Sequence, residues 1–339
     1  MEVASRSGST DAGPPGATDV DGAGADPTTQ DLLTHGGKGS RNRSVLSARI
    51  GAYVALTKPR IIELLLITTI PAMFAAQREV PSLTLVLATL VGGTLAAGSA
   101  NALNCVVDAD IDALMRRTRS RPLARHTVTP RAALIFGVIL GVLAAVELWL
   151  TTTWQASVLA VVAILFYVFV YSMWLKRRTS QNIVWGGLAG CMPVIIGWSA
   201  VTGTIGWPAW VFFGVIFFWT PPHTWALALR YREDYANVEV PMLPVVAPAR
   251  EVARRIVAYS WVMVATSLLL WPVADTGVFY PLAAAALGAV FLVEAHRMWR
   301  RALGTEDLSV IQPMRLFHSS NLYLSLLFVA VALDPLLTR

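Results

Sequence analysis

Runs of about twenty apolar residues recur along most of this chain and constrain its fold more than any other feature. Nine of these runs are long enough to cross the roughly 30 Å hydrocarbon core of a bilayer. They cover approximately residues 59–77, 83–106, 131–150, 154–175, 183–202, 207–229, 255–273, 278–296 and 316–334. Only 14% of the 339 residues are charged, against about 25% in soluble domains. The sequence therefore predicts an all-α, polytopic membrane protein with nine transmembrane helices.

The N-terminal segment differs in composition from the rest of the chain. It is rich in Gly, Pro, Ser, Thr and Asp and contains no apolar run. Such a segment cannot bury enough apolar surface to offset the entropy that it would lose on ordering. It also lacks the basic start and the apolar stretch of a secretion signal. We expect a disordered tail over residues 1–48 and a membrane domain over residues 49–339.

Lysine and arginine gather in alternate loops between the predicted helices. The loops after the second, fourth, sixth and eighth helices are rich in bases, whereas the other four loops contain one base, Arg78. Because basic loops stay on the cytoplasmic side of a membrane, this pattern places the N-terminus in the cytoplasm. It also accounts for the net charge of +6, so this charge does not indicate a nucleic-acid partner. We expect a multi-pass protein of the cytoplasmic membrane.

Three acids and an asparagine lie where the second predicted helix reaches the cytoplasmic side. Asn104, Asp108 and Asp112 are four residues apart, so on a helix they share one face over about 12 Å, while Asp110 falls on the opposite side. Carboxylates one turn apart repel each other, and a divalent cation would relieve that repulsion. Mg²⁺ prefers such oxygen ligands and is commonly bound by one or two carboxylates plus phosphates. The alternative is a solvated helix end, and the spacing alone does not decide between the two.

A double proline, Pro221 and Pro222, lies near the end of the sixth predicted helix and is followed by His223. We expect the prolines to break or kink the helix, because proline lacks the amide hydrogen. Irregular backbone at membrane depth is tolerated where it lines a cavity. His223, the only histidine deep within a predicted helix, is therefore either a ligand or substrate contact or one half of a hydrogen bond between helices. Arg230 and Asp234 follow on the cytoplasmic side, as the acids do after the second helix.

These stretches resemble the intramembrane prenyltransferases of the UbiA superfamily. The pattern NxxxDxxxD at residues 104–112, followed by MRRTRSRPL at residues 115–123, is similar to the first signature of that family. Within the family, five further stretches resemble the branch that farnesylates protoheme IX. They are LTKPRI (56–61), LKRRTSQNIVWGGLAGCMPVIIGW (175–198), WTPPHTWALAL (219–229), DYANVEVPMLPVV (234–246) and RLFHSSNLYLSLLF (315–328). The resemblance covers roughly residues 50–335.

The resemblance implies nine helices around a central cavity, with an active site that faces the cytoplasm. It also implies that Asn104, Asp108 and Asp112 hold Mg²⁺ against a diphosphate. Asp234 matches the first acid of a second signature and is a further candidate for metal binding and catalysis. Val238 stands where other branches carry another Asp, so this side of the cavity offers fewer acids.

Other site residues also follow from the resemblance. The basic residues expected to steady the diphosphate are Lys58, Arg117, Arg121, Lys176 and Arg230. His223 and His318 are expected to hold or orient heme. Trp219, Trp225 and Tyr167 could face a carbocation through their rings, although aromatic residues in membrane helices more often serve packing.

The implied reaction transfers the farnesyl group of farnesyl diphosphate to a vinyl group of heme b, and water then adds to give heme O and diphosphate. The lipid bilayer is the setting, and a downstream heme A synthase is a candidate partner. Two alternatives stay open: a related prenyltransferase that modifies a quinone or a chlorin, and a transporter. Transporters also carry interrupted helices and intramembrane acids, but their binding sites lie near the bilayer midplane. The acids here lie at the cytoplasmic helix ends, which favours the enzyme.

Overall fold

The computed structural model describes the backbone of residues 37–337 and the side chains of residues 46–59, 62 and 67–337. None of these residues lies in a strand. The chain divides into two compact units, residues 1–47 and residues 48–339. Helix α1 spans Gly37–Thr57, so the described part of the predicted tail is helical. Disorder of residues 1–36 stays a prediction, because they lie outside the described residues.

Nine long helices of the described chain match the nine apolar runs. They are α2 (Pro59–Gln77), α3 (Leu83–Val107), α5 (Pro130–Thr151), α6 (Trp154–Leu165) with its π-helical continuation η1 (Phe166–Leu175), α7 (Asn182–Thr202), α8 (Trp207–Arg230), α11 (Ala249–Ala274), α12 (Phe279–Ala302) and α14 (Pro313–Leu337). The connections between them contain four short helices: α4 (Ala109–Leu114), α9 (Arg232–Asn237), α10 (Leu243–Val246) and α13 (Leu308–Ile311).

Seven helices among the described residues are long and apolar enough to cross a membrane. The long helices α2 and α8 are not among these seven. In α8, tryptophans, prolines and His223 lower the mean hydropathy. The prediction of an all-helical, polytopic membrane protein is confirmed, whereas nine spans and a cytoplasmic N-terminus stay predictions.

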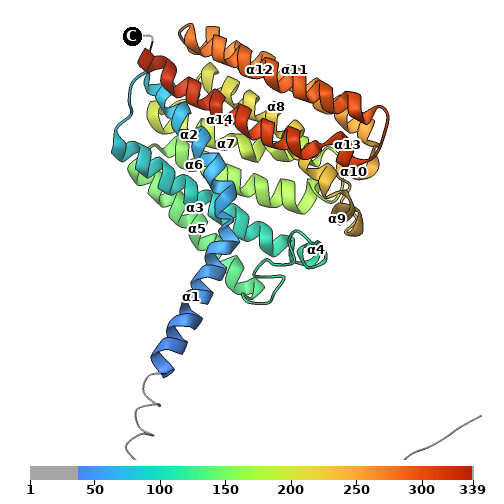
Figure 1. The fold of residues 1–339 in the computed structure, drawn as a ribbon. Coiled ribbons are helices and arrows are strands. Elements are labelled where there is room, and N and C mark those ends of the chain that lie inside the picture. Colours follow the sequence, from blue (N-terminus) through green and yellow to red (C-terminus); the bar gives the residue numbers. More distant parts are fainter. Residues whose placement is uncertain (1–36, 338–339) are drawn as a thin grey trace, which may run out of the picture. The chain divides into compact units, whose positions relative to one another are not determined.

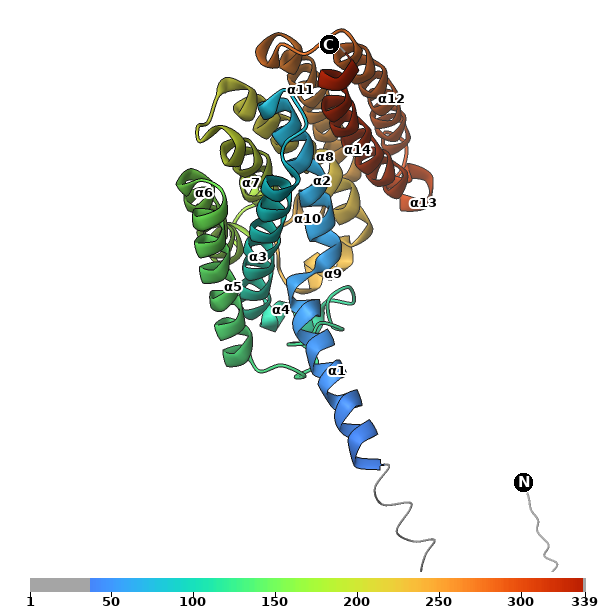
Figure 2. The same cartoon turned by 90° about the vertical axis from the view of Figure 1, so that its left-hand side faces the viewer.

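The long helices form two groups in the unit made of residues 48–339. In the first group, α3 packs against α5, α5 against α6, and α6 against α7. In the second group, α8, α11, α12 and α14 pack in that order, and α14 returns to α8. α2 contacts α3, α7 and α14, and α7 contacts α8, so α2 and α7 join the groups (Figures 1 and 2). Gly92 allows α3 to approach α5 closely, since an added Cβ would lie 2.5 Å from Cγ of Leu148.

Helix α8 is continuous through its double proline. Both Pro221 and Pro222 lie inside a helix that runs from Trp207 to Arg230, so of the two predicted effects a break is wrong, and a kink stays a prediction. Both prolines are buried, and α8 is in contact with α7, α11 and α14. Neighbouring helices can satisfy the carbonyls that a proline frees, which makes proline tolerable inside a membrane helix.

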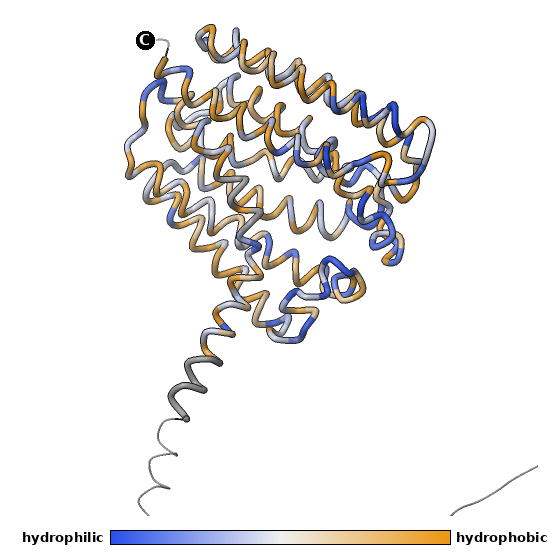
Figure 3. Tube along the Cα trace, in the orientation of Figure 1, coloured by the Kyte–Doolittle hydropathy of each residue, from blue (hydrophilic) through white to orange (hydrophobic). Residues whose placement is uncertain are grey.

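Polar residues concentrate at one end of the long helices. Figure 3 shows apolar residues along the helices and hydrophilic residues around α4, α9, α10 and α13. These short helices belong to the loops after α3, α8 and α12, which are the base-rich loops of the sequence. The fold therefore places the two predicted polar clusters at the same end of the molecule.

Candidate functional site

The predicted acid face lies where α3 ends and α4 begins. The helix is interrupted at Asp108, which ends α3 and starts α4. The interruption is small, because the amide of Asp108 still donates to the carbonyl of Asn104 at 2.9 Å, and that of Asp112 to Asp108 at 2.9 Å. All three side chains are buried. The four-residue spacing therefore keeps its effect despite the break.

Three cations from different parts of the chain contact these residues. Each makes one side-chain bond to the acid face: Lys58 Nζ to Asn104 Oδ1 at 2.6 Å, Lys176 Nζ to Asp108 Oδ2 at 2.6 Å, and Arg121 to Asp112 Oδ2. Of these three cations, only Arg121 follows the acids closely in the sequence, whereas Lys58 lies 46 residues before Asn104 and Lys176 lies 68 residues after Asp108. The fold brings these cations to the acid face from the junction of α1 and α2, from the loop after α4 and from the end of η1.

Lys58 differs from the other two cations in its backbone conformation. Its backbone is left-handed, with φ 54°, at the junction of α1 and α2. Asn101 Nδ2 donates to the carbonyl of Thr57 at 2.8 Å and holds this junction against α3. Burial lowers the pKa of the Lys58 ammonium to about 8. A left-handed non-glycine residue beside buried acids is the kind of strained position found at functional sites.

The two carboxylate oxygens of Asp108 differ in their contacts. Its Oδ2 accepts hydrogen bonds from Lys176 and from Asn104 Nδ2, the latter at 2.8 Å. Its Oδ1 is buried and has no hydrogen-bond partner among the described residues. A buried carboxylate oxygen without a partner is costly unless something binds it.

A magnesium ion fits this donor set, because Asn104, Asp108 and Asp112 offer hard oxygen ligands. Among the described residues, no three His, Cys, Asp or Glu side chains gather as a metal cluster, so a metal here would rely on the asparagine and on oxygens of a substrate.

Asp110 and Asp234 have arginine partners of their own. Asp110 lies opposite the acid face, as the spacing predicted, and binds Arg177 through both carboxylate oxygens at 2.7 Å. Asp234 in α9 accepts from Arg116 Nε at 2.9 Å and from the Arg117 amide at 3.2 Å. Burial alone would raise the pKa of Asp234, but these hydrogen bonds outweigh burial and lower it. Asp234 therefore ties the loop after α8 to the loop after α4, and its binding of a metal stays a prediction.

The remaining predicted diphosphate contacts lie nearer to solvent. The Arg117 guanidinium lies 5.8 Å from the ring centre of Tyr231 and 6.0 Å from that of Tyr235. The Arg230 guanidinium lies 6.0 Å from the ring centre of Tyr231. Both arginines are exposed, and among the described residues no hydrogen bond or ion pair joins their guanidinium groups to the acid face.

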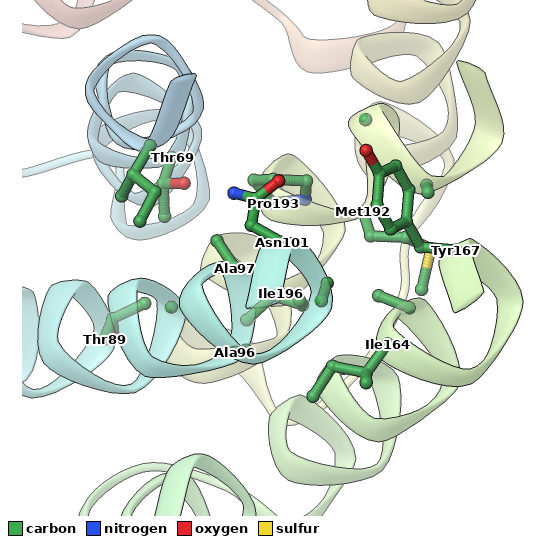
Figure 4. Close-up of a pocket in the computed structure, with 16 residues that line it drawn as sticks. Thr69, Thr89, Ala96, Ala97, Asn101, Ile164, Tyr167, Met192, Pro193 and Ile196 are labelled. Carbon is green, nitrogen blue, oxygen red and sulfur yellow. The ribbon is translucent and has the colours of Figure 1, made fainter. Parts of the chain in front are cut away.

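An apolar cavity of about 160 Å³ lies among α2, α3, α6, η1 and α7. Figure 4 shows its lining, with small residues such as Ala96 and Ala97 on α3 and Tyr167 on η1. Asn101, one turn before Asn104, also lines it. Ser172 connects the cavity to the acids, since its hydroxyl donates to the Tyr167 carbonyl at 2.8 Å and accepts from Asn104 Nδ2 at 2.9 Å. The cavity therefore adjoins the acid face and is lined almost entirely by apolar side chains.

Sequence reasoning missed Ser172 and Arg116. Ser172 lies four residues before Lys176, a spacing that would have placed both on one helix face. Arg116 offered no signal, because its partner Asp234 is 118 residues away. Of the three aromatic candidates, Tyr167 lines the cavity, whereas Trp219 and Trp225 are buried between helices and are not among the cavity residues.

The two predicted heme-contacting histidines differ in their surroundings. His223 packs between two aromatic rings, and its Nδ1 lies 2.9 Å from the hydroxyl of Ser320 on α14. His318, on the same helix as Ser320, is exposed. The hydrogen bond between helices that the sequence left as an alternative is therefore present, but it uses only one of the two ring nitrogens of His223.

Known proteins match this chain over most of its length. The model of the UbiA prenyltransferase family matches residues 65–321. A curated protoheme IX farnesyltransferase of Nocardioides sp. is 70% identical over 288 residues, covering 85% of this chain and 92% of the relative. Another protein of that name, from Cutibacterium acnes, is 59% identical over 300 residues, covering 88% and 89%.

Solved structures show the same fold at low sequence identity. A digeranylgeranylglyceryl phosphate synthase has a TM-score of 0.69 and 16% identity, covering 85% of this chain and 99% of that one. A UbiA homologue from Archaeoglobus fulgidus bound to DMAPP and Mg²⁺ has a TM-score of 0.62 and 15% identity, covering 83% and 99%. At these identities the likeness concerns the fold alone.

Proposed function

Because the chain belongs to the UbiA prenyltransferase family, we propose that it transfers the farnesyl group of farnesyl diphosphate to a vinyl group of heme b. Water then adds, and the products are heme O and diphosphate. The observation that carries the prenyl-transfer step is the buried acid face with its three cations, beside an apolar cavity. The choice of farnesyl and heme is supported by relatives up to 70% identical that bear the name protoheme IX farnesyltransferase.

The acid face and the cations would bind the diphosphate. Asn104, Asp108 and Asp112 would hold Mg²⁺, which when bound supplies positive charge to the departing diphosphate. Lys58, Lys176 and Arg121 already lie within hydrogen-bond distance of these ligands, so their charges are placed where that diphosphate would sit.

The loop residues would complete the entrance of the site. Arg117 and Arg230 would contact the outer oxygens of the diphosphate as the substrate enters. Asp234 would contribute by holding the loop that carries Arg117, and it is also a candidate further ligand for the metal.

The apolar cavity would hold the farnesyl chain and keep water from it. When the bond between farnesyl and diphosphate breaks, an allylic carbocation forms that water would otherwise capture. Small residues such as Ala97 and Gly190 leave room for the chain. The Tyr167 ring lines the same cavity and could stabilise the cation through its face.

The acceptor would enter from the side of α8 and α14. His223 and His318 would hold or orient heme b, so that a vinyl carbon attacks the farnesyl cation. The new positive charge lies on the vinyl carbon next to the porphyrin ring, where water adds and loses a proton. We further propose that the protein lies in the cytoplasmic membrane, with this site facing the cytoplasm and heme O passing to a heme A synthase. The bases in the loops that carry Arg116, Lys176 and Arg230 support that orientation.

Incubation of purified protein with heme b, farnesyl diphosphate and Mg²⁺ tests the proposal, with heme O detected by mass spectrometry. We expect heme O from the wild type, none with EDTA, and about 10²- to 10³-fold less with Asp108→Asn. Asp110→Asn is the matched control, because Asp110 lies outside the acid face and, among the described residues, binds Arg177 and backbone groups of the same turn. Prenylation of a quinone or a chlorin in place of heme would identify a related prenyltransferase. If no acceptor gave a prenylated product, in detergent or in liposomes, the proposal of an enzyme would be overturned and a transporter favoured.

A further inference from the structure

The hydrogen bonds around Ser320 fix which nitrogen of His223 carries the proton. The Ser320 hydroxyl lies 2.7 Å from the carbonyl oxygen of Phe317 and 2.9 Å from His223 Nδ1. A carbonyl oxygen only accepts, and a hydroxyl has one hydrogen, so Ser320 donates to Phe317. Ser320 Oγ must then accept from a protonated Nδ1. In the neutral ring, Nε2 consequently keeps its lone pair.

The surroundings of His223 also fix the orientation of its ring. The Trp219 ring stacks on one side, with ring centres 4.1 Å apart and planes 21° apart. The Phe317 ring lies at 4.5 Å and 31°. Trp219 Nε1 donates to the Ser320 carbonyl at 2.8 Å, so both the side chain and the backbone of Ser320 are bonded to α8. With rings at both faces and Nδ1 bound, the Nε2 edge is the part of the imidazole that can reach a ligand.

Nε2 of His223 has no hydrogen-bond partner among the described residues, and His223 is half-buried rather than enclosed. A neutral imidazole with its Nδ1 hydrogen held by an acceptor and Nε2 free is the form that binds metal ions. Such an imidazole is also the usual axial ligand of heme iron. The proposed substrate contains such an iron, whereas quinones and chlorins without iron do not.

From these contacts we infer that Ser320 is a positioning residue, which holds His223 in the Nδ1-protonated form so that Nε2 binds the iron of the incoming heme. This inference rests on the proposed function, because it assumes that heme is the acceptor. Iron binding would fix the porphyrin relative to the farnesyl cation without any change in the oxidation state of the iron. It also distinguishes the roles of the two candidate histidines, since the exposed His318 ring has, among the described residues, one aromatic neighbour (Phe317 at 5.4 Å and 76°) and no hydrogen bond.

Titration of the purified full-length protein with ferric heme b, followed by absorption and electron paramagnetic resonance, tests the inference. The wild type should show a nitrogen-ligated iron. His223→Ala should lose that signature, free imidazole should restore it, and His318→Ala should keep it. Ser320→Ala should weaken heme binding about 10- to 100-fold, the usual cost of losing a group that orients a metal-binding histidine. Ser319→Ala, the same change one residue earlier, should leave the affinity unchanged.

Nitrogen-15 NMR of histidine-labelled wild-type protein tests the tautomer without any substitution. The chain has five histidines, and His223→Ala assigns the relevant signal. We expect protonated Nδ1 and unprotonated Nε2. The opposite tautomer, an unaltered heme signature in His223→Ala, or wild-type affinity in Ser320→Ala would each overturn the inference. Heme O formation by the wild type is measured separately, so its absence would count against the proposed function and not against the binding geometry.

Discussion

Filling the apolar cavity at Gly190 should shorten the prenyl chain that the protein accepts. Gly190 lines the cavity, and a Cβ added there meets no heavy atom within 4 Å. In Gly190→Leu, the new side chain would project into this open space and occupy the room of about one isoprene unit. Burial of a CH₂ group stabilises by about 0.8 kcal/mol, so displacing a unit of about five carbons costs roughly 3–4 kcal/mol. That corresponds to a change on the order of 10²- to 10³-fold in relative kcat/KM.

The assay compares farnesyl diphosphate with geranyl diphosphate, which is one isoprene unit shorter, and detects the prenylated heme by mass spectrometry. We expect kcat/KM for the farnesyl substrate to fall in Gly190→Leu while that for the geranyl substrate is kept. Gly190→Ala is the matched control, because a methyl group fits the open space and alanine favours the helix by about 0.5–1 kcal/mol. If Gly190→Leu used both substrates as the wild type does, the cavity would not hold the prenyl chain.

Three further predictions concern Asp108, Lys176 and Asp334. Asp108→Asn should reduce kcat by about 10²- to 10³-fold, the typical cost of losing one group that stabilises transition-state charge, with an unchanged thermal unfolding curve as the check on folding. Lys176→Met should raise KM for farnesyl diphosphate and lower kcat, whereas Lys176→Arg should keep part of the activity; equal kinetics in both variants would contradict a diphosphate contact. Asp334→Ala should lower the unfolding temperature in detergent without changing kcat, because the buried Asp334 carboxylate accepts from the amides of Gly277 and Tyr280 at 2.6 and 3.0 Å, and each orphaned amide costs about 1–3 kcal/mol.

The helices and the acid face could be predicted from the sequence because both depend on local patterns. An apolar run of twenty residues has one stable form in a bilayer, so the nine runs correspond closely to the nine long helices among the described residues. A spacing of four residues likewise placed Asn104 beside Asp108 and put Asp110 on the other side. These predictions needed no knowledge of which helices are neighbours.

Local sequence patterns did not predict the backbone at two positions. The double proline was expected to break or kink α8, but the helix is continuous around Pro221 and Pro222, where it packs against neighbouring helices. Conversely, nothing in the spacing of the acid face indicated that the helix is interrupted at Asp108. Tertiary contacts can outweigh a local preference of about 3 kcal/mol, the cost of a proline inside a helix.

The sequence by itself determined that this is a helical membrane protein with a carboxylate face at the end of one helix. Only the tertiary structure decided which cations meet that face, since Lys58 lies 46 residues before Asn104 and Lys176 lies 68 residues after Asp108. It also decided that Ser320, 97 residues from His223, determines the proton position on that ring. Periodicity is a property of a single helix, whereas an ion pair or a hydrogen bond between helices depends on how the helices pack. Pairings of this kind cannot be read from the spacing of residues along the chain.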